Sequence, residues 1–396
     1  MRLSSPHHHR SRRPLARLSV FILIAALTQL AHAGPREQAK RIHDRLTGVP
    51  PNEATLTSMA TKIENGDALG AATEAMQHPA FYNTTIREFA TPWSNRDQSP
   101  YNELNDTTAT VIGMVRDDVP FDQLLHSDLV YVGGAGVSNT PYSQSDNAHY
   151  QQLQNDGIDL SDAQNLVATT QSSLPGSPLQ AAQTAGVLTT RGYSEAFLVA
   201  GTNRAAVRFA TLNFMCLDME EMRDVTAWPD RIRKDVSRAP GGDSAIFLND
   251  CLACHAGLDA LAGAFAFYDF DEELQQLVYT PDAVQAKYSR DAAVFPYGFE
   301  TLGDSWINYW RTGPNAHVGW NGPGSGMGAK SLGMELSQNR RFAECQVTKA
   351  ITKVCHRTPN GAADLQAVAS IADSFEANNR SMQRVFAESA VHCMGE

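Results

Sequence analysis

Several regular patterns are missing from this sequence, and each absence narrows the class of protein. The chain shows no sustained alternation of apolar and polar residues, so large β-sheets are not expected. It shows no internal repeat, so a repeat architecture is not expected either. Its 32 Lys and Arg residues are outnumbered by 43 Asp and Glu residues, and so acidic a chain is poorly suited to bind nucleic acid. We therefore expect a mainly α-helical globular protein without a nucleic-acid partner.

Long apolar runs are also scarce. Beyond residue 33 no segment stands out as long and apolar enough to span a membrane, and no cysteine follows Ala33 directly to carry a lipid. The start of the chain is different: five arginines precede a mostly apolar stretch from Leu18 to Leu30, and Ala31-His32-Ala33 fits a small-x-small cleavage site. That stretch of about 13 residues is shorter than the roughly 20 needed to cross a bilayer.

Residues 1–33 are therefore predicted to be a secretory signal peptide. Cleavage after Ala33 would leave a soluble periplasmic or secreted chain with no transmembrane segment. It would also remove five arginines and no acidic residue, which moves the formal net charge from −11 to −16.

The chain has six cysteines, and an exported chain can use cysteines as disulfides because its compartment is oxidising. Two of them belong to the motif described below. The other four allow three pairings, among which the sequence does not choose. These four are Cys216, Cys345, Cys355 and Cys393.

Apolar residues at helical spacing fill much of the chain from Glu37 to about Asp128. From Gly133 to about Ala182 the sequence is rich in Ser, Asn, Gln, Gly and Pro, which predicts a long polar loop with one short helical stretch near 161–169. We expect an N-terminal helical region with a polar loop over 34–184, and a second helical domain over 185–396.

The segment Cys251-Leu252-Ala253-Cys254-His255 matches the attachment sequence of a c-type heme. Two thiols three residues apart on a helical turn can reach the two vinyl groups of a porphyrin, and the next residue presents its imidazole to the iron. A redox C-x-x-C pair or half of a zinc site would use similar residues. However, the redox pair usually follows a strand in an α/β pattern, and no second C-x-x-C is present to complete a zinc site. The motif therefore predicts one covalent heme c on Cys251, Cys254 and His255, with His255 as an iron ligand.

The second axial ligand is predicted to be Met327. It lies after the motif in the glycine-rich segment 313–333, where many small cytochromes place an axial methionine on a loop. An open sixth position is the main alternative. Other candidate side chains are Met215, Met334, His149, His317, His356 and His392.

Two groups of residues could surround the heme. A basic stretch before the motif could pair with the propionates, although a solvated surface explains it as well. An aromatic and charged cluster after the motif could line a distal pocket, although core packing would also explain it. The basic residues are Arg231, Arg233, Lys234 and Arg238, and the cluster comprises Asp304, Trp306, Tyr309, Trp310 and Arg311.

Five pieces of sequence, in order, resemble the heme-c modules first noted in planctomycete cytochromes. The family's patterns are approximately Arg-x-Gly-Leu-Leu-Thr, Cys-x-x-Cys-His-x-x-Met-Asp-Pro, an aromatic-Asp pair, Phe-x-x-Cys and Gly-Arg-x-Pro. This chain departs from them with Asp259-Ala260 in place of Asp-Pro and His356-Arg357 in place of Gly-Arg. The resemblance covers most of residues 115–390 and implies heme and export rather than a substrate. The matching pieces are Asp117–Leu125, Ala185–Gly192, Cys251–Ala260, Phe270-Asp271, and Phe342–Cys345 with Arg357–Pro359 and Asp364.

These features together predict a mainly α, irregular multi-helix protein with a cytochrome c-like heme module in its C-terminal half. Its function would be electron transfer in the periplasm through one covalent heme, between redox partner proteins. A heme enzyme with an open distal site, of peroxidase or oxidoreductase type, is the alternative. A bare electron carrier needs only about 100 residues, so the length of this chain favours that alternative somewhat.

Overall fold

Helices make up most of the structure, as the sequence predicts. The computed structural model describes residues 33–199, 201–237 and 243–395, so almost all of the expected signal peptide lies outside the described residues. The α-helices are α2 (Pro35–Thr47), α3 (Glu53–Glu64), α4 (Ala68–Ala75), α5 (Arg87–Ala90), α6 (Asp106–Arg116), α7 (Ala148–Asn155), α8 (Arg191–Phe197), α9 (Arg204–Met215), α10 (Ser244–Ile246), α11 (Leu252–Ala262), α12 (Gly328–Ser337), α13 (Arg340–Cys355), α14 (Gly361–Ala377) and α15 (Met382–His392).

Side-chain caps explain where several helices begin. The side chains of Asn52, Asp67 and Asn105 each accept a hydrogen bond from a backbone N–H in the first turn of the following helix, which satisfies a donor that has no partner within the helix. Helix α2 ends at Gly48, whose φ of 74° is readily adopted by glycine. These local signals separate short helices in the N-terminal third of the chain.

Within the described residues, three antiparallel two-stranded sheets interrupt the helices. The strands are β1 (Leu129–Gly133), β2 (Leu166–Thr170), β3 (Tyr268–Asp271), β4 (Gln276–Tyr279), β5 (Ser305–Ile307) and β6 (Ser325–Met327). The pairs are β1 with β2, β3 with β4, and β5 with β6, with Tyr131 opposite Ala168 in the first of them.

The prediction of a short helix near 161–169 is wrong. That segment leads into strand β2, and the helix of the polar region is α7 instead. Strand β2 contains Val167, Thr169 and Thr170, and β-branched residues fit a pleated surface better than a helix. Pairing with β1, which lies more than 30 residues earlier, decides the conformation.

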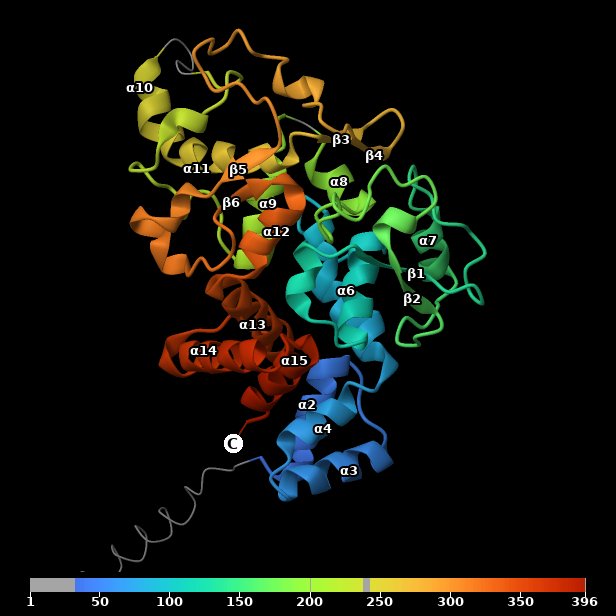
Figure 1. Cartoon of the computed structure of the whole chain (residues 1–396). Helices are drawn as coiled ribbons and strands as arrows, with labels where there is room; N and C mark the ends of the chain where they lie inside the picture. Colours follow the sequence, from blue (N-terminus) through green and yellow to red (C-terminus); the bar gives the residue numbers. More distant parts are fainter. Residues whose placement is uncertain (1–32, 200, 238–242, 396) are drawn as a thin grey trace, which may run out of the picture.

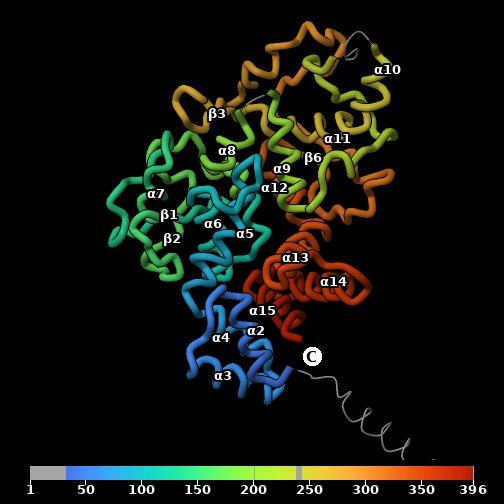
Figure 2. The backbone as a smooth tube through the Cα atoms, turned by 180° about the vertical axis from the view of Figure 1, so that it is seen from behind, coloured from blue at the N-terminus to red at the C-terminus, as the bar shows by residue number. Residues whose placement is uncertain are grey.

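The two ends of the described chain lie side by side. Helices α2 and α4 pack against α15, and Figures 1 and 2 show the N-terminal helices beside α13 to α15 at one end of the molecule, with α10 and α11 at the other. The main hydrophobic core extends from Ala39 to Cys393 and includes residues on both sides of residue 185. The division of the chain at that residue stays a prediction.

Two disulfides connect the helices. Cys216, directly after α9, is bonded to Cys345 in α13, with a Cα–Cα distance of 5.4 Å. Cys355 at the end of α13 is bonded to Cys393 after α15, with a Cα–Cα distance of 5.7 Å. The structure thus selects one of the three pairings that the sequence allowed.

One helical run is more apolar than the sequence analysis expected. Among the described residues, Ser244–Phe265 is the one helical segment long and apolar enough, by length and composition, to cross a membrane. Half of it is buried inside the protein, a property it shares with the core helices of soluble proteins. The predicted absence of a transmembrane segment in the mature chain stays a prediction.

Candidate functional site

The Cys-x-x-Cys-His motif lies within this long helical run. Asp243 caps the run by accepting a hydrogen bond from the backbone N–H of Ala245. After the short helix α10, a π-helical turn over Phe247–Cys251 leads directly into α11. Such wider turns are rare and are often found at functional sites. Cys251 therefore lies at the junction of two helical geometries, with Cys254 and His255 in the first turn of α11.

The two motif cysteines are free thiols, whereas the other four cysteines form disulfides. Cys251 packs against a small apolar cluster formed by Ile232, Val236 and Phe247. Cys254 packs against the main core, and its Sγ lies 3.4 Å from the carbonyl oxygen of Met219. Burial raises the pKa of the Cys254 thiol, which is opposite to the shift that activates redox cysteines.

The imidazole of His255 is oriented by a buried carboxylate. Its Nδ1 lies 3.2 Å from Oδ1 of Asp259, one turn later in α11, and donates to that oxygen when the proton is on Nδ1. The His255 side chain is 25% exposed, whereas that of Asp259 is fully buried. This tautomer leaves the lone pair of Nε2 available to a metal, as in the carboxylate–histidine pairs that orient metal ligands.

Asp259 belongs to a network of buried charges. Arg204 donates from Nε to Oδ1 of Asp259 at 2.6 Å, and from Nη1 to Asp235 at 2.6 Å. The backbone N–H of Arg233 donates to Oδ2 of Asp259 at 3.2 Å. Burial alone would raise the pKa of Asp259, but the guanidinium groups of Arg233 and Arg204 and the hydrogen bond from His255 hold it well below its usual range. The carboxylate beside His255 is therefore ionised.

Large apolar side chains are exposed on the helical run and on the segment hydrogen-bonded to it. Val225 and Trp228 are 77% and 73% exposed, and Leu248, in the π-helical turn, is 54% exposed. The segment that contains Val225 contacts the helical run, since the N–H of Asp224 donates to the carbonyl oxygen of Ala253 at 3.0 Å. Exposed apolar side chains gathered in one region indicate a surface that binds something.

The aromatic cluster after the motif packs against α11. A Cβ on Gly257 would lie 2.2 Å from the indole of Trp310, so glycine is required for this close approach. Trp310 is fully buried, and its Nε1 has no hydrogen-bond partner among the described residues. Trp306 donates instead to Ser331, Tyr309 to Asp230, and Arg311 forms an ion pair with Glu335. Packing accounts for most of this cluster.

Met327 lies at the end of strand β6 and is 69% exposed. Its partner in the sheet is Ser305, whose carbonyl oxygen would lie 2.3 Å from a Cβ on Gly263. Gly263 is eight residues beyond His255, about 12 Å along a helix that rises 1.5 Å per residue. The structure thus does not bring Met327 next to His255, and its assignment as the sixth ligand stays a prediction.

The other candidate ligands are scattered. Met215 is fully buried in the core, and His149 accepts a hydrogen bond at Nε2 from the N–H of Gly133. His392 pairs with Asp364 at 2.8 Å, whereas His317 and His356 are exposed. Met334 is partly buried in α12.

The basic residues before the motif have partners within the protein. Arg231 lies over the ring of Phe299, at 4.6 Å from its centre. Lys234 pairs with Glu300 at 2.6 Å. Arg233 is 2% exposed and donates to Thr202, while its Nε and Nη1 have no hydrogen-bond partner among the described residues. Arg238 lies outside the described residues, so the proposed role of this stretch in binding propionates stays a prediction.

Two pieces of the family resemblance contact each other. The guanidinium of Arg191 lies 5.7 Å from the centre of the Phe270 ring. Arg357 forms a salt bridge with Asp364, and Cys345 is in a disulfide. The contact between Arg191 and Phe270 joins elements far apart in the chain, whereas Arg357 and Asp364 are seven residues apart. The sequence analysis did not find Arg204 and Asp235, because neither lies at a recognisable spacing from the motif.

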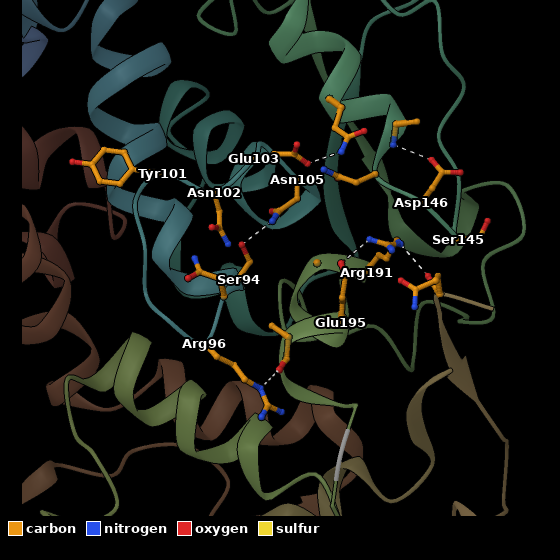
Figure 3. Close-up of a pocket in the computed structure, with 17 residues that line it drawn as sticks. Ser94, Arg96, Tyr101, Asn102, Glu103, Asn105, Ser145, Asp146, Arg191 and Glu195 are labelled. Atoms are coloured by element: carbon orange, nitrogen blue, oxygen red, sulfur yellow. Dashed lines mark hydrogen bonds and ion pairs between the residues drawn. The ribbon is translucent and has the colours of Figure 1, made fainter. Parts of the chain in front are cut away.

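A second site candidate is a polar cleft of about 770 Å³. Figure 3 shows Arg191 and Glu195 of α8 facing it, together with Asn105 and the segment around Asp146. Arg191 donates to Glu195 at 2.9 Å, Asn105 donates to Ser94 at 2.8 Å, and Gln151 donates to Glu103 at 2.5 Å. The cleft contains charges of both signs, most of them already paired.

In the described part of the chain, no group of three or more His, Cys, Asp or Glu side chains converges to hold a metal ion. The comparisons with known proteins add no assignment: no family model, no curated protein and no solved structure matches this chain.

Proposed function

We propose that this protein is an exported monoheme c-type cytochrome that transfers electrons in the periplasm. The observation that carries the proposal is that two unpaired cysteines and a histidine with an available Nε2 lie together on a helical run whose surroundings expose large apolar side chains. An oxidising compartment favours disulfides, so the presence of two free cysteines in a chain whose other four cysteines are paired requires an explanation. Covalent attachment of heme to both thiols would explain why they are not paired.

The residues fit a covalent heme in their chemistry. The thiols of Cys251 and Cys254 would add to two vinyl groups, each sulfur forming a C–S bond while its proton passes to the adjacent carbon. The exposed Val225, Trp228 and Leu248 would be covered by the flat apolar faces of the group. When bound, heme would supply a one-electron redox centre.

His255 would bind the iron through Nε2, and Asp259 would hold its ring and keep the proton on Nδ1. Because Asp259 is ionised and fixed by Arg204, the imidazole would be a stronger electron donor than one bonded to a neutral carbonyl. The surrounding charges are fixed in place, so little reorganisation of the protein would accompany electron transfer.

A heme enzyme with an open distal position is the second candidate. The exposed Met327 favours it, because Ser305, its partner in strand β5, approaches Gly263 after the end of α11 rather than His255. In that case the sixth position would be free for peroxide, oxygen or another small ligand. The two candidates share the same attachment residues and differ at the sixth position.

The test is an intact mass and a pyridine hemochrome spectrum of the full chain matured in the periplasm. We expect the mass of the polypeptide after signal removal plus one heme, and colour that acidified organic solvent does not extract. Cys251→Ser and Cys254→Ser should each remove one thioether. Cys216→Ser is the matched control, since it removes a disulfide cysteine and should leave the heme attached.

A polypeptide that weighs only as much as its amino acids would refute the proposal. If heme is present, the optical spectrum separates the two candidates. A low-spin spectrum with a methionine–iron band near the red end is expected for the electron carrier, and a high-spin ferric form that binds cyanide readily for the enzyme.

A further inference from the structure

A further cleft, formed largely by residues of α9 and α13 and the segments around Trp93 and Glu220, has an apolar wall and a lysine. Its volume is about 860 Å³, and it exposes more apolar than polar surface. Phe89 and Trp93 form part of the wall, Leu212 of α9 lies beside them, and Lys349 and Thr352 of α13 complete it. This volume is in the range of small-molecule sites, which are mostly apolar with a few placed polar groups.

Lys349 is the distinctive polar group of this cleft. It is partly buried, its ammonium donates to the main-chain carbonyl of Asn213, and its Nζ lies 4.9 Å from the centre of the Trp93 ring. Among the described residues no carboxylate forms an ion pair with it. Burial lowers the pKa of Lys349 to about 7, which favours the neutral amine near pH 7 more than for a solvated lysine.

Lys353, one turn later in α13, provides an internal comparison. It lines the same cleft, but its ammonium is paired with the carboxylate of Glu88. The same helix therefore presents one lysine that has an ionic partner and one that has none. Lysines in apolar surroundings without a counter-charge are the ones that act as amine nucleophiles.

We propose that this cleft binds an apolar aldehyde or ketone, which Lys349 captures as a Schiff base. The nitrogen lone pair forms a bond to the carbonyl carbon, and the carbonyl oxygen takes up the two protons that the amine loses and leaves as water. No oxidant or reductant is needed. The step is reversible, so the cleft would hold its ligand covalently without consuming it.

The charged groups around the cleft do not neutralise Lys349. Asp218 is engaged by Arg208 at 2.7 Å, and Lys353 by Glu88. Glu220, Glu221 and His356 also line the cleft, and all three are exposed. The apolar wall formed by Phe89, Trp93 and Leu212 is what selects a ligand with a hydrocarbon part.

The experiment uses the full chain matured in the periplasm, incubated at pH 7 with hexanal and sodium cyanoborohydride, which reduces an imine to a stable secondary amine. Peptide mass mapping then gives the alkylation rate of each lysine. We expect Lys349 to react at least about tenfold faster than Lys353, because Lys353 is paired with the carboxylate of Glu88 and Lys349 has no ionic partner among the described residues. The rate at Lys349 should rise between pH 6 and 8.

Three variants and two controls sharpen the test. Lys349→Met should abolish the fast reaction, Lys353→Met should leave it unchanged, and Thr352→Trp should slow it by filling the cleft. Denaturant should make all lysines react alike, which shows that the folded cleft is responsible. Equal rates at Lys349 and Lys353 in the native protein would overturn the proposal.

Glyoxylate, which has no apolar part, should react more slowly at Lys349 than hexanal, and an equal rate would overturn the assignment of an apolar ligand.

Discussion

His255 and Asp259 are joined across one turn of α11, with 3.2 Å between Nδ1 of the imidazole and Oδ1 of the carboxylate. The contact orients the histidine of the Cys-x-x-Cys-His motif from a residue that is itself buried and fixed by Arg204. It connects the proposed iron ligand to the charged network that supports α11.

The first prediction concerns this contact. Asp259→Asn would leave Arg204 and Arg233 with one fewer carboxylate, and removing one partner of a buried ion pair costs about 3–5 kcal/mol. In the heme-loaded protein the variant should also have a higher reduction potential, because an anionic partner of the proximal imidazole favours ferric iron. Redox titration and denaturant unfolding measure the two effects.

Asp235→Asn is the matched control for this prediction. Asp235 also pairs with Arg204, at 2.6 Å, but no contact joins it to His255 within the described residues. We expect a comparable loss of stability with a smaller change in potential. Equal shifts of potential in the two variants would mean that the direct contact with His255 has no special effect.

The sixth ligand gives a second prediction. Met327→Ala should remove the methionine–iron band of the loaded protein if Met327 is the ligand, and since its side chain is 69% exposed the change should alter stability by no more than about 0.5 kcal/mol. Met334→Ala serves as the control. An unchanged band in the Met327 variant would eliminate this ligand.

Close packing on α11 gives a third prediction. Gly257→Ala would place a methyl group within 2.2 Å of the Trp310 indole, and such overpacking typically costs about 1–3 kcal/mol. We expect a lower unfolding midpoint. Gly303→Ala should hardly change the unfolding midpoint, since no atom lies within 4 Å of the added Cβ. Similar midpoints for both variants would show that Trp310 moves away freely.

The disulfides provide a fourth prediction. The Cys216–Cys345 bond closes a loop with a sequence separation of 129, and Cys355–Cys393 one with a separation of 38. Loop entropy assigns them about 5 and about 4 kcal/mol. Replacing either pair by serines should lower the free energy of unfolding by roughly these amounts. Non-reducing peptide mapping checks the pairing itself, and a different pairing would contradict the structure.

The fifth prediction concerns pH. Hydrogen bonds from Arg357, from the N–H of Asn360 and from His392 hold the pKa of Asp364 well below its usual range. A lowered pKa in the folded state means that this carboxylate stabilises the protein fully above its unfolded pKa, near 3.9, and progressively less as the pH falls. Asp364→Asn should therefore lower the unfolding midpoint most at neutral pH. A difference that stays constant from pH 7 to pH 2 would contradict this.

The helical class of the protein could be read from the sequence, since helical spacing of apolar residues, capping side chains and breaks at glycine and proline all act within a few residues. The same holds for the motif, because Cys251, Cys254 and His255 fall on neighbouring positions of one helical run by spacing alone. Asp259 was named only as part of the family resemblance, and its contact with His255 was not predicted.

Other features depend on residues far apart in the chain. Strand β2 was mistaken for a helix because its partner β1 lies outside any local window. The disulfide pairing followed only from the approach of α9 and α15 to α13. Arg204 reaches Asp259 across 55 residues, and Lys349 lies over Trp93 across more than 250.

The sequence by itself indicated the mainly helical class and placed Cys251, Cys254 and His255 on one helical run, because both depend on spacing along a single helix. Tertiary structure alone decided which carboxylate is ionised beside His255 and which lysine lies in a cleft without a counter-charge. Those properties depend on burial and on charges brought together from distant elements, and no local pattern specifies either one.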